Sequence, residues 1–524
     1  MALNQRRAGI LLHPTSLPGR FGIGDLGPEC LHFLNWVHDT GLTYWQILPL
    51  GPTGFGDSPY QCFSAFAGNP LLISPELLVQ EGLITQEELD QWPASHGNVD
   101  YGASLHYKNL VLRSAFNRFR ESANPEIHHR LKQWSGRQSV KTWLNDYALF
   151  RALKKENHER CWTDWPEPEK LYQPYALDAA RDRLRDEIDY QVFIQFLFFD
   201  QWENVRREAA ARNIEIIGDA PIYVSFDSAD TWANQSYFML DASGKPTHVA
   251  GVPPDYFSET GQLWGNPIYN WQTMEENGFQ WWMDRLVSVF ETVDIVRLDH
   301  FRGFMGYYMV PADHKTAEHG EWKPGPGEKF FRAVEQKFAD LPIIAEDLGE
   351  ITEDVTEVRD QFDLPGMVIL QFAWPPAQLT PLVADPNNHF LPHRHTKNQV
   401  VYTGTHDNDT TMGWWRNSST PDERTSMQVY LSTDGNLANW DLIRCGMQSV
   451  ANTFIVPAQD LLSLDSDARM NLPGRPAGNW CWRLQENQLT TDLSARLRDF
   501  LLLYERCDNP PETAIPAPPK EPLY

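Results

Sequence analysis

The chain has 524 residues, 42% of them hydrophobic, and a formal net charge of −26 at pH 7. That charge repels nucleic acid and anionic membrane surfaces, so a neutral substrate is favoured and neither of those partners is expected. The apolar runs are shorter than the roughly 18 residues of a membrane span, and the length predicts a large barrel with insertions or several domains.

The N-terminal region leads into a short apolar run at residues 8–12, which His13 and Pro14 follow without a small-residue cleavage site. This pattern indicates a first strand and not a secretory signal peptide. The six cysteines lack CxxC spacing, which in a chain of this size indicates reduced thiols in a cytoplasmic protein and no zinc site. They are Cys30, Cys62, Cys161, Cys445, Cys481 and Cys507.

Short apolar runs, each with a polar C-terminal edge, predict eight β-strands. In chain order they span residues 9–13, 44–50, 214–219, 294–300, 343–347, 367–372, 399–403 and 453–456. Helical patterns lie between most of them, and residues 28–40 begin with proline and are followed by Gly41, as helices often are. The alternation predicts an α/β fold with a parallel sheet, and eight strands suggest a closed (β/α)8 or TIM barrel.

The predicted strands are unevenly spaced along the chain. Residues 61–190 exceed what one crossover helix needs, and their patterns predict a mostly helical subdomain inserted between the second and third strands. Residues 227–270 show no clean period and predict an irregular insertion after the third strand, beside the active site. We therefore expect residues 1–60 and 191–507 to form the catalytic barrel, and the proline-rich residues 508–524 to form an extended tail.

The fourth predicted strand ends in Arg297-Leu298-Asp299-His300. Polar residues at the C-terminal ends of barrel strands converge on one mouth, where such folds place their chemistry. Side chains alternate along a strand, so Arg297 and Asp299 share a face, and the guanidinium favours the ionised carboxylate that a nucleophile needs. A simple ion pair that fixes the strand end would leave the same pattern. Asp294, at the opposite end of the strand, is expected to be structural.

Glu346 and Asp347 follow the apolar run at residues 343–345, and because they are adjacent only one can point into the mouth. Apolar surroundings raise the pKa of a carboxyl group, so Glu346 could give a proton to a leaving glycosidic oxygen. A structural role for Glu346 fits the pattern equally well. Asp347 is expected to cap the turn that begins at Leu348.

Two further strand ends carry polar clusters. His406 and Asp407, after the seventh strand, could bind sugar hydroxyls, and a third carboxylate could stabilise a cationic transition state. No second histidine lies at ligand spacing, so a metal site is not expected. Asp219 ends the third strand, where it could hydrogen-bond a sugar or cap a turn. Two or three convergent carboxylates are what cleavage of a glycosidic bond requires.

The glycine-rich residues 51–60 follow the second strand but lack the Gly-Lys-Ser/Thr ending of a phosphate-binding loop. Their glycines allow sharp turns. Such turns would present Asp57, Ser58 and Tyr60 at the barrel mouth.

Several motifs occur together and in a fixed order. They are HPTSLPG at residues 13–19, GDSPYQ at 56–61, GD at 218–219, AGVPPDYF at 250–257, GQLWGNP at 261–267, RLDHFRG at 297–303, AEDLG at 345–349 and THDN at 405–408. With these motifs, nearly the whole chain resembles the 4-α-glucanotransferases of glycoside hydrolase family 77. These enzymes are also called amylomaltases or disproportionating enzymes.

The resemblance implies a (β/α)8 barrel with insertions that acts on α-1,4-glucans by a retaining double displacement, without a cofactor. It implies that Asp299 is the nucleophile, Glu346 the acid/base and Asp407 the transition-state stabiliser. Phe55 is a departure, because relatives often carry Tyr there and the hydroxyl is lost. The substrate-binding residues expected from the loop or from the resemblance are Ser58, Tyr60, Asp219, Trp264 (in the loop after the third strand), Arg297 and His406.

We therefore expect an enzyme that passes a segment of a maltooligosaccharide, amylose or another α-1,4-glucan to the 4-hydroxyl of a second glucan or of glucose. Transfer requires that the acceptor outcompete water, which aromatic loops over the cleft could ensure. One alternative is an α-amylase-type retaining hydrolase with the same carboxylates. The other is a glucan-binding barrel without catalysis.

Overall fold

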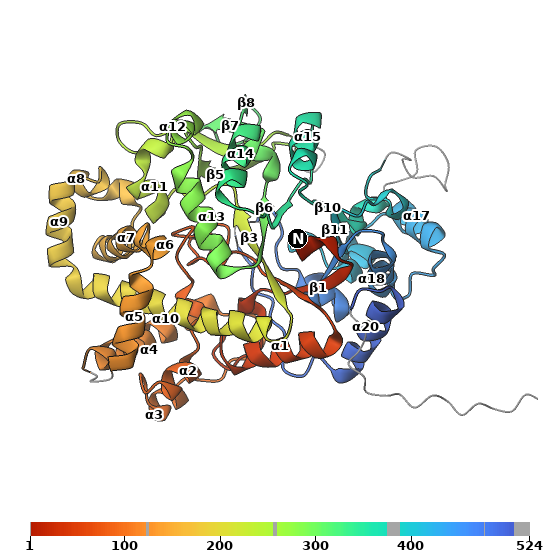
Figure 1. Ribbon diagram of the computed structural model, residues 1–524, viewed down its shortest axis with the longest axis horizontal. Helices are drawn as coiled ribbons and strands as arrows, with labels where there is room; N and C mark the ends of the chain where they lie inside the picture. Colours follow the sequence, from red (N-terminus) through yellow and green to blue (C-terminus); the bar gives the residue numbers. More distant parts are fainter. Residues whose placement is uncertain (1, 122–124, 255–258, 375–387, 476, 508–524) are drawn as a thin grey trace, which may run out of the picture.

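The computed structural model describes residues 2–121, 125–254, 259–374, 388–475 and 477–507. Its central feature is an eight-stranded parallel sheet in the order β10-β11-β12-β1-β2-β3-β6-β9 (Figure 1). The strands are β1 (Arg7–Leu11), β2 (Tyr44–Gln46), β3 (Glu215–Pro221), β6 (Ile295–Asp299), β9 (Ile343–Ala345), β10 (Gly366–Ile369), β11 (Gln399–Tyr402) and β12 (Thr453–Pro457). Each overlaps a predicted strand, and the (β/α)8 barrel is confirmed.

The barrel closes between β9 and β10, the two ends of the strand order. The Ala345 amide donates a hydrogen bond of 2.9 Å to the carbonyl of Pro365. Asp347 adds a side-chain link, because its Oδ1 accepts the Met367 amide at 2.7 Å and its Oδ2 lies 2.5 Å from Arg359 Nη1. A buried carboxylate thus joins strands that share few backbone bonds.

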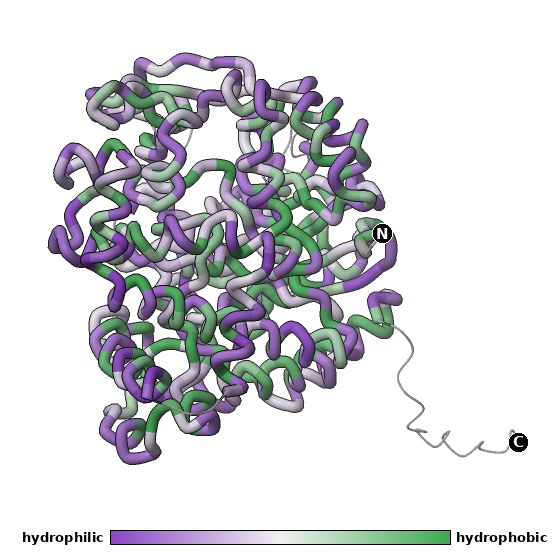
Figure 2. Tube along the Cα trace, turned by 60° about the vertical axis from the view of Figure 1, so that its left-hand side comes forward, coloured by the Kyte–Doolittle hydropathy of each residue, from purple (hydrophilic) through white to green (hydrophobic). Residues whose placement is uncertain are grey.

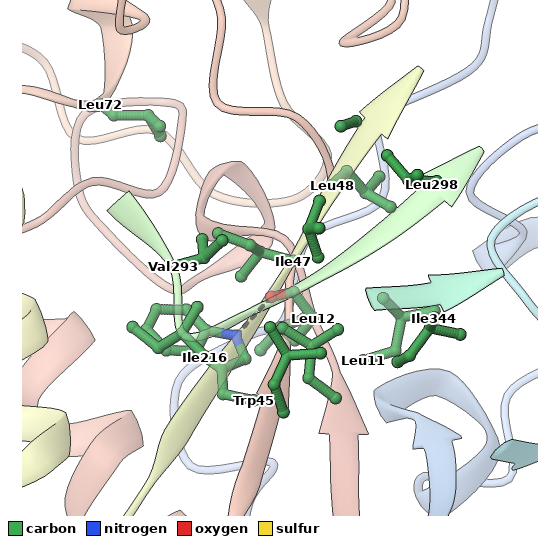
Figure 3. Close-up of a cluster of buried hydrophobic side chains, with 14 of the residues drawn as sticks. Leu11, Leu12, Trp45, Ile47, Leu48, Leu72, Ile216, Val293, Leu298 and Ile344 are labelled. Atoms are coloured by element: carbon green, nitrogen blue, oxygen red, sulfur yellow. Dashed lines mark hydrogen bonds between the residues drawn. The ribbon is translucent and has the colours of Figure 1, made fainter. Parts of the chain in front are cut away.

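Apolar residues of the strands and of the covering helices form one large core, apart from which lie two small clusters. Figure 2 shows hydrophobic segments concentrated toward the middle of the molecule. Trp45 of β2 is fully buried, and its indole N–H donates to the Leu12 carbonyl at 2.7 Å (Figure 3). Its ring lies 5.2 Å from Phe33 of α1 (Pro28–Thr40) and 6.1 Å from Trp202 of α10 (Arg185–Ala210), so this one residue links two outer helices to the barrel.

Helices cover the barrel and fill the long connection between β2 and β3. Those of the connection are α2 (Pro75–Gln80), α3 (Gln86–Asp90), α4 (Tyr101–Glu121), α5 (Pro125–Ser135), α6 (Gln138–Lys141), α7 (Leu144–Glu156), α8 (Glu167–Lys170), α9 (Pro174–Arg183) and α10 (Arg185–Ala210). Those elsewhere are α1 (Pro28–Thr40), α11 (Ala229–Ala233), α12 (Trp271–Glu276), α13 (Gln280–Thr292), α14 (Glu328–Lys337), α15 (Glu353–Gln361), α16 (Thr411–Gly413), α17 (Pro421–Leu431), α18 (Ala438–Gln448), α19 (Ala458–Leu461) and α20 (Thr491–Leu503). No helix of the described chain is long and apolar enough to cross a membrane.

A second, antiparallel sheet lies beside the barrel, in the order β5-β4-β7-β8. Its strands are β4 (His248–Val252), β5 (Gln262–Pro267), β7 (Gly306–Pro311) and β8 (Glu321–Pro324). The expectation that residues 227–270 are irregular is therefore wrong for β4 and β5. β4 pairs with β5 and also with β7, which comes only after β6, and neither β4 nor β5 lies in a stretch with a clean period. Residues 255–258 and the expected tail at 508–524 lie outside the described residues.

Candidate active site

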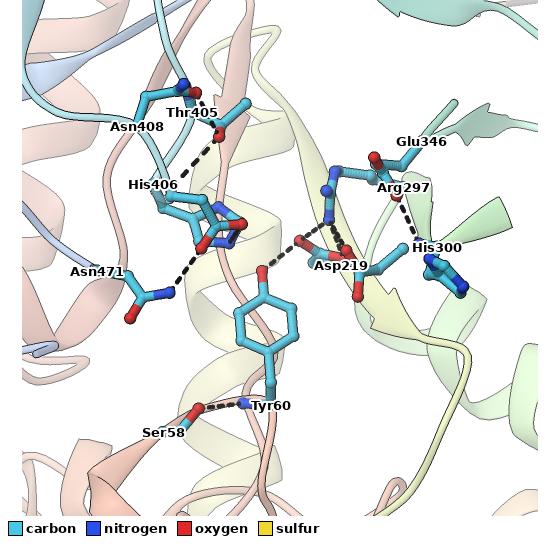
Figure 4. A network of polar contacts seen from close by, with 12 residues as sticks. Ser58, Tyr60, Asp219, Arg297, His300, Glu346, Thr405, His406, Asn408 and Asn471 are labelled. Carbon is cyan, nitrogen blue, oxygen red and sulfur yellow. Dashed lines mark hydrogen bonds and ion pairs between the residues drawn. The ribbon is translucent and has the colours of Figure 1, made fainter. Parts of the chain in front are cut away.

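The carboxyl ends of β3, β6 and β9 bring together polar side chains that are far apart in sequence (Figure 4). The parallel register of β3 and β6 pairs Asp219 with Arg297. The register of β6 and β9 pairs Leu298 with Ala345, so Glu346 follows immediately beside the end of β6. Parallel strands carry such residues to one edge, as the sequence predicts.

Arg297 links two carboxylates. Its Nη1 lies 2.7 Å from Asp219 Oδ2 and 2.9 Å from Asp299 Oδ1. The side chains of Arg297 and Asp219 are 3% and 0% exposed, whereas that of Asp299 is 26% exposed. A buried cation needs compensating charge, which the enclosed Asp219 provides. Asp299 is thus the member of this trio that solvent or a substrate can reach.

Tyr60 extends this network from the loop after β2. Its hydroxyl donates to Asp219 Oδ2 at 2.7 Å. Burial raises the pKa of Asp219 to about 6 although Arg297 opposes the rise, and burial also raises the pKa of Tyr60 well above its ordinary value. At neutral pH the phenol therefore remains the donor. Ser58 Oγ accepts the Tyr60 amide at 3.2 Å, a contact that shapes the loop itself.

Glu346 has the environment of a carboxyl group that holds its proton. Burial, aided by the charge of Asp299, raises the pKa of Glu346 to about 8. This occurs although Glu346 Oε2 accepts the His300 amide at 2.7 Å and Oε1 accepts the Leu348 amide at 3.1 Å. The expectation that Asp347 caps the turn at Leu348 is wrong, because Glu346 accepts that amide while Asp347 points into the β9–β10 seam.

Asp407 is held from two sides. His406 Nε2 lies 3.2 Å from its Oδ2, and Asn471 Nδ2 donates to its Oδ1 at 2.6 Å. Burial opposes ionisation, but these two partners outweigh it and hold the pKa of Asp407 well below its ordinary value. Burial lowers the pKa of His406, yet Asp407 more than reverses that effect and raises it. The carboxylate still keeps 42% of its side-chain surface exposed.

Aromatic rings surround the cluster. The Tyr60 ring stacks on His406 with centroids 5.2 Å apart, and Trp480 lies 5.7 Å from Tyr60. Trp264 lies on β5, not in a loop as expected, and its ring meets that of His300 edge-on at 4.9 Å. Flat rings beside polar groups suit the apolar faces and the hydroxyls of sugars.

Asn471, Trp480 and the backbone of His300 were missed as candidates. Asn471 and Trp480 follow no predicted strand and belong to a stretch without helix or strand period. His300 lies in the RLDHFRG motif. Its backbone is left-handed, with φ of 53°, and its amide donates the hydrogen bond to Glu346. A hydrogen bond from a backbone amide does not depend on the type of side chain, so the sequence does not indicate it.

Comparison with known proteins assigns the family. The sequence profile of the 4-α-glucanotransferase family matches residues 12–490. The chain belongs to this family. It is 47% identical to the 4-α-glucanotransferase of Thermus thermophilus, over 96% of this chain and 99% of that one. Identity to the 4-α-glucanotransferase of Synechocystis sp. is 48%, again over 96% of this chain and 99% of the relative.

A solved relative has the same overall structure. An amylomaltase from Streptococcus agalactiae, determined in complex with acarbose, superposes with a TM-score of 0.91 at 36% identity, over 96% of this chain and all of that one. The resemblance predicted from the motifs is confirmed, and the chain is an enzyme of 4-α-glucanotransferase activity. This decides against the α-amylase-type hydrolase and the non-catalytic barrel.

Proposed function

We propose that Asp299, Glu346 and Asp407 carry out the transfer by a double displacement. The observation that carries this assignment is the contrast between two neighbouring carboxyl groups. Asp299 is paired with Arg297 and partly open, whereas burial raises the pKa of Glu346 to about 8. Two titratable groups with opposed environments are the usual basis of nucleophile and acid assignments.

In the first step a carboxylate oxygen of Asp299 forms a bond to the anomeric carbon of the donor sugar, and the bond from that carbon to the glycosidic oxygen breaks. Glu346 gives its proton to the departing oxygen and becomes ionised. The shortened glucan leaves, and the donor segment stays bound to Asp299 as an ester.

In the second step the 4-hydroxyl oxygen of an acceptor sugar attacks the same carbon. Glu346 takes the hydroxyl proton, and the ester bond to Asp299 breaks. Both steps pass through a sugar cation, and we assign its stabilisation to the carboxylate of Asp407, ionised by His406 and Asn471. A retaining mechanism of this kind expects the carboxyl groups of Asp299 and Glu346 to be about 5–5.5 Å apart.

The remaining residues would bind and orient the sugar beside the scissile bond. Arg297 and Asp219 keep Asp299 oriented, and Tyr60 and His406 offer stacked rings to the same sugar. We assign substrate contact also to Trp264, beside the acid/base, and to Ser58 in the loop that carries Tyr60. Acarbose, which the Streptococcus agalactiae amylomaltase binds, is expected to occupy this site.

We infer that the substrates are maltooligosaccharides, amylose and other α-1,4-glucans, and that the enzyme serves starch or glycogen metabolism in the cytoplasm. Neutral glucans suit a chain with a net charge of −26. We take residues 61–190 as an inserted subdomain, and residues 227–270 as an insertion that lines the site through Trp264.

Incubation of the enzyme with maltotriose alone tests the proposal. Transfer predicts a ladder of glucans longer than maltotriose, together with free glucose and maltose. Hydrolysis would give shorter products only, and binding without catalysis would leave maltotriose intact. Asp299→Ala should abolish the ladder, and full activity in that variant would overturn the assignment.

A further inference from the structure

An irregular segment after β12 reaches the active site from outside the barrel strands. It follows a 3-10 turn at Ser466–Ala468 and runs to Leu484. The Trp480 amide donates to Met470 O at 2.7 Å, and the Leu484 amide donates to Ser16 O at 2.9 Å. The segment is thus folded back on itself and fastened to the loop after β1.

Within this segment, Arg469 spans the gap to the catalytic loop after β11. Its Nη2 donates to the backbone carbonyl of Asp407 at 2.5 Å, and its Nε donates to the backbone carbonyl of Asn471 at 2.6 Å. One planar guanidinium edge therefore holds the two residues together. Lysine lacks such a fork.

Asn471 makes two further bonds to the loop after β11. The Asn471 amide donates to His406 O at 3.0 Å, and Asn471 Nδ2 donates to Asp407 Oδ1 at 2.6 Å. Arg469 thus fixes the backbone of both partners in the side-chain bond between Asn471 and Asp407. It touches only backbone atoms here, so its effect on Asp407 is indirect.

Asp407 needs such support. It stands on a loop beyond the end of β11, and its side chain is 42% exposed. A pocket of about 30 Å³ beside this loop is lined by residues that include His406 and Arg469. A charge that stabilises a transition state must be held within a fraction of an ångström, and loops achieve this only when neighbouring residues fix them.

We infer that Arg469 is a positioning residue that orients Asp407 by clamping the loop after β11 to the segment containing Asn471. The inference rests on the role proposed for Asp407. On this inference, Arg469 affects the rate of both transfer steps although it does not lie at the end of a barrel strand.

The test compares Arg469→Met with Arg483→Met in the full chain. Arg483 lies in the same segment and donates to three backbone carbonyls, those of Gly97, Gly19 and Ser95, at 2.8 to 2.9 Å. It is therefore a matched control that removes a guanidinium away from Asp407. Arg469→Lys and the milder Arg469→Gln complete the set, in case Arg469→Met does not fold.

The readout is the burst of fluoride from an α-maltosyl fluoride donor, which needs no proton from Glu346. Arg469→Met should slow this burst on the order of 10²-fold with a smaller change in KM, and Arg469→Lys should recover little of the loss. Arg483→Met should lower the unfolding temperature but keep the burst within about threefold.

A burst in Arg469→Met within threefold of wild type would overturn the inference, as would an equal loss in Arg483→Met. Full rescue by Arg469→Lys would also overturn it, because charge alone would then suffice. If the wild-type enzyme itself gives no burst and no maltotriose ladder, the proposed function fails instead.

Discussion

Arg297 and Asp299, two residues apart on β6, form an ion pair in which Nη1 and Oδ1 are 2.9 Å apart. The same Nη1 holds the fully enclosed Asp219 at 2.7 Å. A single buried nitrogen of Arg297 therefore bonds both carboxylates. The enclosed Asp219 fixes the guanidinium, and the guanidinium in turn orients the partly exposed Asp299.

Arg297→Lys keeps the positive charge but replaces the planar fork with a single ammonium group. We expect kcat for maltotriose disproportionation to fall on the order of 10²-fold, because Asp299 loses its fixed orientation. Arg206→Lys is the matched control, since Arg206 pairs with Asp294 at 2.7 Å at the opposite end of the same strand. It should retain activity within about threefold. Equal losses in both variants would contradict the role given to Arg297.

The raised pKa of Glu346, about 8, predicts an alkaline limit to activity. The proton that Glu346 must donate is present below that pH and is lost as the pH rises through it, so kcat/KM for maltotriose should decline above about pH 8. Fluoride release from α-maltosyl fluoride needs no such proton and should lack this decline. Glu346→Gln should keep a single fluoride burst while its transfer from maltotriose falls on the order of 10²- to 10⁴-fold. A pH decline that persists with the fluoride donor would exclude Glu346 as its cause.

Asp347, next to the proposed acid/base Glu346, should affect stability more than chemistry. Asp347→Ala removes the bond to the Met367 amide and the ion pair with Arg359, both at the barrel seam. The free energy of unfolding should fall by about 3 kcal/mol, measured by chemical denaturation. Folded Asp347→Ala should retain much more activity on maltotriose than Glu346→Gln. If Asp347→Ala lost more activity than Glu346→Gln, the roles given to Asp347 and Glu346 would be the wrong way round.

Arg506 should be essential to stability although it lies far from the chemistry. It is fully buried and donates to six backbone carbonyls, those of Arg7, Gly446, Met447, Ser449, Ala451 and Asn452. Arg506→Ala removes all six of these bonds, although Arg6 still donates to the carbonyls of Met447 and Ser449. Unfolding should therefore become easier by about 3 kcal/mol. Arg498→Ala, at a partly exposed position of α20 where the guanidinium makes one bond of 3.3 Å to the Asp39 carbonyl, should change stability by about 1 kcal/mol or less. Similar stability of the two variants would refute this account of the C-terminal anchor.

The barrel strands were predictable because each is a short apolar run that ends in polar residues. This pattern also located Asp219, Arg297, Asp299 and Glu346, since parallel strands deliver their C-terminal ends to one place. Asn471, the second partner of Asp407, was not predictable, because it is 64 residues farther along the chain in a segment without period. The role of Asp347 escaped prediction for a related reason.

Asp347 bonds to one residue of a helix and one of a strand, whereas the expectation of a turn cap considered only its neighbours in sequence. The small sheet of β4, β5, β7 and β8 escaped because its strands lie in stretches without a clean period, and the pairing of β4 with β7 crosses β6. Contacts between residues distant in sequence thus explain the role of Asp347, the bond of Asn471 to Asp407 and the pairing of β4 with β7.

The most direct test of the central claim is to identify the residue that carries the sugar in the covalent intermediate. Glu346→Gln treated with α-maltosyl fluoride in the absence of acceptor should accumulate the intermediate, because the base needed for its breakdown is missing. Mass spectrometry of the digested protein should then find one maltosyl group on the peptide that contains Asp299, at that residue. A maltosyl group on Asp407 or Asp219, or rapid fluoride release with no labelled peptide, would contradict the account.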